Sequence, residues 1–343
     1  MLFRSYGFKL EGFDCVVTNE LLTERLKIQE ANDKCVNKSG YIYGDITKEE
    51  IKNKIFTEIN NWKNQTGKQI DVVIATPPCQ GMSTANYKKG NELNRNSLVI
   101  EAIEIVKKIE PKIFVFENVS AFLNSMCIDV DEKYDTIQNA INTHLGEKYN
   151  IYADVINFKD YGVPSSRPRT LVIGTLKTLR NISPLNIFPL AEEQKTVEEA
   201  ISHLPVLDWG EIDKDDIYHA FRTYPEYMRP WITNIKEGYS AFHNDEEYRP
   251  YKIVDGKKIP LKGAYLGNKF KRLDWDKPAA CIATRNDQLA SQSTIHPSQD
   301  RVLSIRELMI LMSIPKTFRW TNEIIEPNWT IEQKRKRSEE RRV

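Results

Sequence analysis

The sequence predicts an α/β protein with a doubly wound, mostly parallel sheet and a smaller irregular region placed before the chain returns to the sheet. Up to about residue 178, short apolar runs rich in β-branched residues alternate with helical patterns. The runs are apolar nearly throughout, as in parallel strands that helices cover on both faces. From about 178 to 290, prolines and mixed aromatic and charged residues replace this alternation.

The expected elements follow one another along the chain. Strands are expected at 13–18, 41–46, 70–75, 113–116, 151–156 and 171–173. Helical patterns occupy 21–32, 47–64, 98–109, 133–145 and 304–312. Pro77 and Pro78 end the third strand, and Pro315 ends the last helix. In such a sheet, ligands bind at the carboxyl ends of the strands.

This pattern divides the chain into four segments. We expect a catalytic domain at 1–178, a target-recognition region at 179–292, a return to the catalytic domain at 293–320 and a charged tail at 321–343. The tail mixes acidic and basic residues, which favours a solvated helix or a disordered end over a nucleic-acid-binding arm.

Composition limits the classes of function. Lys and Arg total 49 against 48 Asp and Glu, a net charge of +1, so any basic surface must be local. The sequence has no run of eighteen apolar residues and no secretory signal, which excludes a transmembrane helix and indicates a cytoplasmic protein. Five cysteines without a CxxC pair indicate reduced thiols and no metal site.

Cys79 is the first candidate for catalysis. It follows the expected strand at 70–75 in the segment ATPPCQGMS, where two prolines stiffen the backbone and direct the thiol out of the sheet. A thiol in this place can act as a nucleophile if nearby charge favours the thiolate. A buried cysteine at a strand end is the alternative, and it is the commoner one for a lone cysteine.

Two further groups follow apolar strands. Glu117 and Asn118 come directly after the strand at 113–116, where a low dielectric raises the pKa of a carboxyl and lets it donate to a heterocycle nitrogen. The alternative is that this pair merely begins the next segment. Arg167 and Arg169 stand at i and i+2 of an extended stretch, so their side chains point the same way. Both can therefore bind a carboxylate or a phosphate.

In this order, the residues resemble the DNA (cytosine-5-)methyltransferase family. The resemblance runs from about Gly7 to Phe318, and several separately spaced motifs are more specific than any one of them. Its motifs are PPCQGMS, RNSL at 95–98, ENV at 117–119, the arginines at 167 and 169, TVEEAISHLP at 196–205, TIHP at 294–297, DRVLSIRE at 300–307 and Ile314-Pro315.

The resemblance implies a mechanism on a cytosine flipped out of duplex DNA. Cys79 would attack C6, which prepares C5 to accept a methyl group from S-adenosylmethionine. Glu117 would protonate or hydrogen-bond N3, and Arg167 and Arg169 would hold the base carbonyl, Glu117 or a phosphate. Asn118 would position the cysteine loop. The residues do not identify the base that removes the C5 proton.

The resemblance also implies binding residues. For the cofactor, Glu20 would bind the ribose hydroxyls, and Asp45 and Ile46 would contact the adenine. Pro77 would lie against the cofactor. A plain turn aspartate after Gly44 is the alternative for Asp45.

For DNA, polar and basic side chains in two regions supply the expected contacts. A solvated basic face is the alternative for any single lysine. The expected contacts are Gln80, Ser83, Arg95, Lys269, Lys271 and Arg272.

The sequence departs from the family at both ends. The opening Phe-x-Gly-x-Gly loop and the closing Gly-Asn-x-Val-Pro segment do not occur, and both would flank the cofactor. We therefore expect this chain alone to bind S-adenosylmethionine weakly, with a sheet edge exposed beside Val16 and Val17. A second subunit or a longer polypeptide would restore the pocket.

Three functions from different classes follow. The favoured one is a bacterial DNA cytosine-5 methyltransferase of a restriction–modification or orphan type, acting in the cytoplasm on the nucleoid. The second is a non-autonomous DNA-binding subunit of a split methyltransferase. The third is a tRNA cytosine-5 methylase, which the long variable region and the TIHP segment disfavour.

Overall fold

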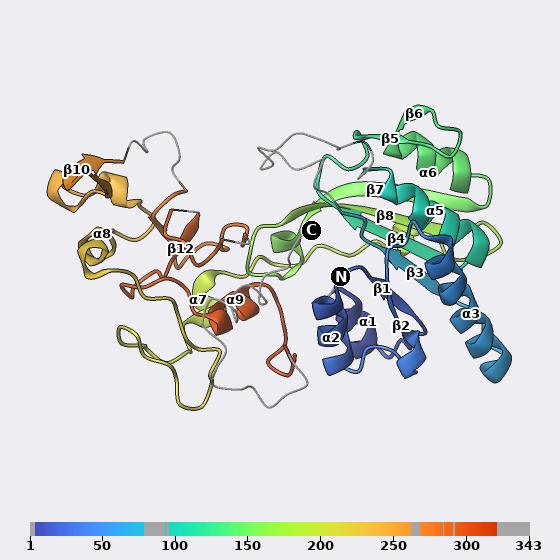
Figure 1. The fold of residues 1–343 in the computed structure, drawn as a ribbon, viewed down its shortest axis with the longest axis horizontal. Helices are drawn as coiled ribbons and strands as arrows, with labels where there is room; N and C mark the ends of the chain where they lie inside the picture. Colours follow the sequence, from blue (N-terminus) through green and yellow to red (C-terminus); the bar gives the residue numbers. More distant parts are fainter. Residues whose placement is uncertain are drawn as a thin grey trace.

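The computed structural model describes residues 4–78, 93, 96–261, 268–283, 285–290 and 292–320. A sheet with helices packed on it forms one side of the molecule, and short helices, turns and a hairpin form the other side (Figure 1). The sheet side comes from the first half of the chain, as the alternating pattern predicts.

The largest sheet has the strand order β3-β4-β8-β7. Its strands are β3 (Val72–Ala75), β4 (Ile113–Asn118), β7 (Tyr149–Asn157) and β8 (Pro168–Leu176). β3 pairs with β4 in parallel, whereas β8 is antiparallel to both of its neighbours. Three strands therefore point the same way, which confirms the expected fold class. β8 runs in reverse because only a short connection separates it from β7, and parallel neighbours need a longer crossover.

A second, two-stranded sheet consists of β1 (Thr18–Glu20) and β2 (Tyr41–Tyr43), which pair in parallel. The strand expected at 13–18 thus begins later, because Cys15 forms only an isolated bridge with Cys35. Among the residues described, β1 pairs only with β2 and β3 pairs only with β4. The two sheets therefore face each other across unpaired edges.

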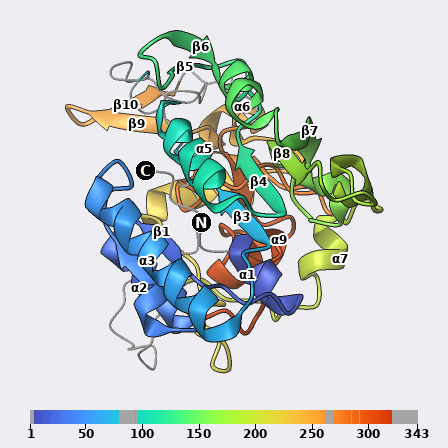
Figure 2. The same cartoon turned by 90° about the vertical axis from the view of Figure 1, so that its right-hand side faces the viewer.

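Helices cover both sheets (Figure 2). α3 packs its apolar face, including Ile55 and Trp62, against the β1–β2 pair. α5 and α6 pack against β4, whose Phe114 and Phe116 are fully buried. The helices of this part are α1 (Arg4–Leu10), α2 (Thr23–Ala31), α3 (Glu49–Thr66), α5 (Leu98–Ile109) and α6 (Ile137–Leu145), and a small hairpin is formed by β5 (Met126–Ile128) and β6 (Tyr134–Thr136).

The segment after β8 is built from short elements around its own apolar cluster, which includes Phe221, Trp231 and Phe270. Prolines and the lack of a steady period explain why no long helix or strand forms there. Its helices and strands are α7 (Val197–Ile201), α8 (Arg229–Thr233), β9 (Tyr251–Val254), β10 (Lys257–Pro260), β11 (Lys271–Arg272) and β12 (Ser293–Ile295).

The chain then returns through α9 (Ile305–Leu311), which begins at a capping box formed by Ser304 and Glu307. This return contacts the N-terminal part of the chain. Asn32, at the end of α2, donates from Nδ2 to the carbonyl of Arg319 (2.6 Å) and accepts from the Arg319 amide (2.9 Å). Ser165 Oγ donates to the carbonyl of Leu311 (2.6 Å), which fixes the loop before β8 to α9.

Candidate active site

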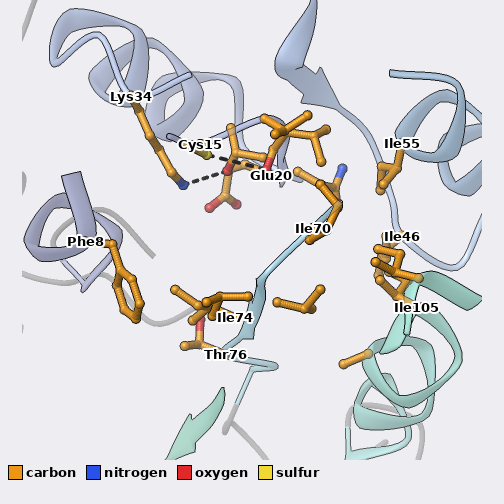
Figure 3. A pocket seen from close by; sticks show the side chains of 18 of the residues that line it. Phe8, Cys15, Glu20, Lys34, Ile46, Ile55, Ile70, Ile74, Thr76 and Ile105 are labelled. Carbon is orange, nitrogen blue, oxygen red and sulfur yellow. Dashed lines mark hydrogen bonds between the residues drawn. The ribbon is translucent and has the colours of Figure 1, made fainter. Parts of the chain in front are cut away.

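A cavity of about 650 Å³ lies between the β1–β2 pair and the edge of β3. It extends to the carboxyl ends of β1, β3 and β4, where an α/β sheet presents its ligand-binding side chains. Figure 3 shows Ile70, Ile74 and Thr76 along β3 and its flanks, with Phe8, Lys34 and Glu20 on one side and Ile46, Ile55 and Ile105 on the other.

Three of the expected catalytic residues line this cavity together. Glu117 and Asn118 end β4, and Arg169 comes from the adjacent β8. Arg169 Nε lies 3.1 Å from Glu117 Oε1, and each side chain is only 5% exposed. Arg169 Nη1 also donates to the carbonyl of Pro168 (2.5 Å). The sheet thus holds a carboxyl group and a guanidinium in fixed positions at one wall of the cavity.

Asn118 links the ends of two parallel strands. Its Nδ2 donates to the carbonyl of Pro77 at 3.0 Å, and its Oδ1 accepts from the Val119 amide at 2.9 Å. Pro77 lies two residues before Cys79 in the sequence. The bond therefore anchors the backbone from which the cysteine segment departs.

Arg167, the second expected arginine, has different surroundings. Arg167 is half-buried before β8 and does not line the cavity, although its backbone amide donates to Asn157 Oδ1 (2.7 Å). The expected pair of parallel guanidinium groups is thus divided between two environments. The predictions for Cys79, Gln80, Ser83 and Arg95 fall outside the residues that the structure describes.

All four residues expected to bind the cofactor line the cavity: Glu20, Asp45, Ile46 and Pro77. Glu20 ends β1 and accepts the Leu22 amide at Oε1 (3.2 Å). Asp45 accepts the amide and hydroxyl of Thr47 at Oδ1, the turn-aspartate geometry, while still facing the cavity.

Gly44 shapes the turn that brings Asp45 there. Its φ is +145°, and a Cβ at this position would lie 2.4 Å from Cδ1 of Ile51. A side chain at residue 44 would therefore collide with α3.

Sequence reasoning missed a polar group at the β1 wall of the cavity. Lys34 is 8% exposed and donates from Nζ to Thr18 Oγ1 and Gln29 Oε1, both at 2.7 Å. Burial lowers the pKa of the Lys34 ammonium group. No local motif marks this lysine, because its partners lie on β1 and α2.

Cys15 and Cys35 lie beside that lysine, with their sulfur atoms 3.7 Å apart. The hydrogen bond with Cys35 and the charge of Lys34 lower the pKa of Cys15 to about 7. The same hydrogen bond and burial raise the pKa of Cys35. The Cys15 thiol lines the cavity and is half-buried, so the cavity contains an acidic thiol that the sequence did not mark.

The residues expected to contact DNA differ in their surroundings. Lys269 and Lys271 are half-buried on the side formed by the segment after β8. Arg272 is 3% exposed, and its guanidinium donates to four backbone carbonyls, of Ile232, Ile235, His296 and Gln299, and to Asp300 Oδ1, at 2.6–2.9 Å. The expectation that Arg272 contacts DNA is corrected, since all of this hydrogen bonding stabilises the fold.

Across the described ranges, no cluster of three or more His, Cys, Asp or Glu side chains could hold a metal ion. In the same part of the chain, no helix combines the length and apolar character needed to cross a membrane.

Comparison with known proteins assigns the family. The model of the C-5 cytosine-specific DNA methylase family matches residues 4–327. The chain belongs to this family. As a member, it is a DNA cytosine-5 methyltransferase, which confirms the resemblance and the expected class of enzyme. The methylase family uses S-adenosylmethionine as methyl donor and DNA as substrate, so both are expected for this member.

Curated relatives agree with the methylase family. The chain is 33% identical over 326 residues to the Type II methyltransferase M1.HgaI of Avibacterium volantium, covering 90% of this chain and 84% of the relative. It is 29% identical to M.DdeI of Desulfomicrobium norvegicum, covering 76% and 66%, and 30% identical to M1.HphI of Haemophilus parahaemolyticus, covering 73% and 61%. The chain thus spans a little under two thirds of the length of the last two.

Solved structures support the fold of this methylase family member. The Dnmt2 methyltransferase of S. pombe matches with a TM-score of 0.56 at 12% identity, covering 98% of this chain and 88% of that one. A mutant form of DNMT2 of Spodoptera frugiperda matches with a TM-score of 0.52 at 14% identity, covering 98% and 91%. At these identities the likeness shows the fold alone.

Proposed function

We propose that this chain methylates C5 of a cytosine flipped out of a specific site in duplex DNA, through a covalent bond between Cys79 and C6 of the base. The observation that carries the proposal is the cavity wall formed by Glu117, Asn118 and Arg169. These side chains converge beside the Pro77 backbone that leads to Cys79.

Each residue has one role in this reaction. The Cys79 thiolate adds to C6 while Glu117 protonates or hydrogen-bonds N3, so electron density moves to C5. S-adenosylmethionine supplies the methyl group that C5 accepts. Loss of the C5 proton to a base and departure of Cys79 then restore the aromatic ring. Asn118 keeps the cysteine segment in position through the Pro77 carbonyl.

The two arginines bind different parts of the substrate. Arg169 Nη2 is buried and has no hydrogen-bond partner within the described ranges, so it can donate to the carbonyl of the flipped base. Arg167 lies outside the cavity, directly before β8, where it would reach the DNA backbone. The two guanidinium groups therefore have separate roles and do not bind the same group.

The residues at the carboxyl ends of β1 and β2 suit S-adenosylmethionine. Glu20 places a carboxylate beside the cavity, as hydrogen bonding to ribose hydroxyls requires. Asp45 and Ile46 offer a polar and an apolar contact for an adenine, and Pro77 closes the side next to β3. These residues would hold the cofactor beside the catalytic wall.

DNA recognition belongs to the segment between β8 and α9. We assign catalysis to residues 1–178, target recognition to 179–292, the return to 293–320 and a charged tail to 321–343. Lys269 and Lys271 would contact phosphates, together with Gln80, Ser83 and Arg95. The Type II names of the relatives support a restriction–modification role, in which the protein would act on bacterial DNA in the cytoplasm, at the nucleoid.

The covalent step is tested with DNA that carries 5-fluorocytosine at the target position. Fluorine cannot leave as a proton, so the chain should remain attached to the DNA through Cys79 when cofactor and any required partner are present. Denaturing electrophoresis and peptide mass spectrometry would detect the adduct. An active preparation that methylates ordinary DNA but forms no adduct would overturn the covalent mechanism.

Cys79→Ser is the matched variant, because a hydroxyl is a much weaker nucleophile than a thiolate. It should abolish methyl transfer and trapping while DNA binding survives in a gel-shift assay. Cys127→Ser is the control, since Cys127 is fully buried behind α5 and α6 and should be dispensable for chemistry. Near-normal turnover by Cys79→Ser would show that Cys79 is not the nucleophile.

A further inference from the structure

Cys15 and Cys35 lie opposite each other on two neighbouring stretches of backbone. The two residues form an isolated parallel bridge, and the Val36 amide donates to the Cys15 carbonyl at 3.0 Å. Adjacent extended segments lie about 4.8 Å apart, which is within the range of about 4.4–6.8 Å between the Cα atoms of disulfide-bonded cysteines. The two sulfur atoms already lie 3.7 Å apart. Small rotations of the two side chains would therefore bring them to bonding distance.

The backbone around the pair maintains this close approach. The Cys35 amide donates to the Tyr41 hydroxyl at 2.8 Å. Gly40 packs between the two stretches, because a Cβ there would lie 2.3 Å from the Val16 carbonyl oxygen and 3.1 Å from the Cys35 Cβ. A side chain at residue 40 would therefore collide with both segments that carry the cysteines.

The two thiols differ in their surroundings. Cys15 is half-buried and follows the exposed Asp14, whereas Cys35 is 8% exposed. Lys34 lies on the same wall of the cavity as Cys15 (Figure 3), and the hydrogen bond with Cys35 and the Lys34 charge lower the pKa of Cys15 to about 7. The hydrogen bond with Cys15, burial and the Glu58 carboxylate raise the pKa of Cys35. Near neutral pH, Cys15 is therefore largely available as thiolate, the form that reacts with oxidants, while Cys35 keeps its proton.

The pair lies at the opposite end of β1 from the proposed cofactor site. Cys15 precedes β1, and Glu20 ends it. β2 runs parallel to β1, and Cys35 precedes β2 whereas Asp45 follows it. Both thiols therefore lie away from the carboxyl ends of the strands, where catalysis and cofactor binding are assigned, and methyl transfer gives neither of them a role.

We propose that Cys15 and Cys35 form a reversible oxidation site for hydrogen peroxide, in which Cys15 is the attacking thiol and Cys35 the resolving one. The Cys15 sulfur attacks one peroxide oxygen, the O–O bond breaks, and the other oxygen takes up a proton from solvent and leaves as water, which yields a sulfenic acid. Cys35 then attacks the Cys15 sulfur, the S–O bond breaks, and the departing oxygen leaves as a second water with the Cys35 proton. The two thiols lose two electrons to the peroxide, and a disulfide remains.

Peptide mass spectrometry on the 343-residue chain tests the proposal. The reduced protein is treated with hydrogen peroxide, free thiols are blocked with iodoacetamide, and trypsin cleaves after Lys and Arg. Cys15 and Cys35 then lie in separate peptides, residues 10–25 and 35–38. These peptides should be recovered joined, at the sum of their masses less two hydrogens, and a reducing agent should separate them. Cys281, which is also half-buried, is the internal control and should stay free.

Two cysteine variants separate the roles of the thiols. Cys35→Ser leaves the Cys15 sulfenic acid without its resolving thiol, so dimedone should label Cys15 in this variant and much less in the parent. Cys15→Ser should give no joined peptide and no oxidation of Cys35. Cys79 falls in a third tryptic peptide, residues 69–88, so its reactions are measured separately.

A lysine variant tests the effect of the neighbouring charge. Lys34→Met should slow oxidation of Cys15 by about tenfold, because the fraction of thiolate falls when the cation is removed. Lys38→Met is the matched control, since Lys38 is exposed, and it should oxidise at the rate of the parent. Thermal unfolding shows whether Lys34→Met is folded, and the two cysteine variants suffice for the test if it is not.

Three results would overturn the proposal. One is oxidation of Cys281 as fast as that of Cys15. Another is oxidation of Cys15 without formation of the joined peptide. The third is a joined peptide that forms only between two chains, which a dimer on a non-reducing gel would reveal. None of these readouts depends on methyl transfer, so the proposed function keeps its own separate test.

Discussion

Arg169 Nε lies 3.1 Å from Glu117 Oε1 across the β4–β8 pairing, and the two side chains are almost entirely excluded from solvent. Such a pair does little for net stability, because desolvation of both groups offsets much of their attraction. Its effect is positional. The guanidinium holds the Glu117 carboxyl at the cavity wall in one orientation, as the proposed contact with N3 of a flipped base requires.

Glu117→Gln should lower kcat for methyl transfer by about 100-fold or more, since glutamine keeps the shape but supplies no proton. The KM for DNA should change little. Transfer of tritiated methyl groups to DNA measures both constants, with the exposed Glu198→Gln on α7 as control. A kcat within about twofold of the parent would show that Glu117 does not act as the acid.

Asn118→Ala should impair catalysis without impairing folding or DNA binding. Loss of the bond from Nδ2 to the Pro77 carbonyl costs about 1 kcal/mol in stability, but a displacement of about 1 Å in the cysteine segment costs up to about 100-fold in rate. The rate of trapping on 5-fluorocytosine DNA should fall with kcat. Asn139→Ala on the exposed face of α6 is the control. Unchanged trapping would mean that Asn118 does not position Cys79.

Substitutions of the neighbouring residues Arg272 and Lys271 should have different effects. The change at Arg272 should lower stability, and the change at Lys271 should weaken DNA binding. Arg272→Lys cannot remake the five hydrogen bonds of the guanidinium, so the free energy of unfolding should fall by on the order of 3 kcal/mol. Lys271→Gln should leave that free energy within about 0.5 kcal/mol. It should weaken DNA binding and reduce the slope of log K against log salt by about 1.

Urea unfolding and DNA titrations at several salt concentrations measure the two effects. The assignment fails if Arg272→Lys is as stable as the parent and lowers the salt slope instead.

His296 should make folding sensitive to mild acid. Burial holds the pKa of His296 at about 4, against 6.5 for an exposed histidine, although the Glu307 carboxylate opposes this effect. The folded pKa is depressed, so the unfolded chain binds a proton first as the pH falls. Stability is therefore complete above about pH 6.5 and is lost progressively down to about pH 4, by on the order of 3 kcal/mol for this group.

His296→Asn offers the matched test, because its oxygen can accept the Ser298 and Gln299 amides that His296 Nδ1 now accepts. Urea unfolding of the parent and the variant is measured from neutral pH down to about pH 4.5. The free energy of unfolding should fall clearly for the parent and by a smaller amount for the variant. If the free energy of unfolding depends on pH equally in the two proteins, another group controls the response to acid.

Sequence patterns predicted the elements that have strong local signals. The strand at 70–75, the helix at 98–109 and the helix after Ser304 all form close to the expected residues, because apolar periodicity, prolines and a capping box act locally. The cavity that joins Glu20, Asp45, Glu117 and Arg169 also agrees with the expectation that carboxyl ends of strands gather polar side chains.

Features that depend on contacts between distant segments could not be predicted from the sequence. Arg272 looks like any basic residue of a surface patch, and only carbonyls from distant segments determine that it is buried. Lys34 meets Thr18 and Gln29 because β1 and α2 come together in space. The gap between β1 and β3 depends on which strands pair, and no local pattern encodes that choice.

The reciprocal bonds between Asn32 and Arg319 have a consequence for synthesis on the ribosome. The two residues are 287 positions apart, so at about 5–20 residues per second the partner of Asn32 emerges roughly 15–60 s later. Ile28 of α2, which packs in the same cluster as Phe318 and Trp320, stays without that cover during this time. Helix α2 is thus translated long before the segment that completes its packing, so its apolar side around Ile28 stays exposed on the nascent chain for that interval.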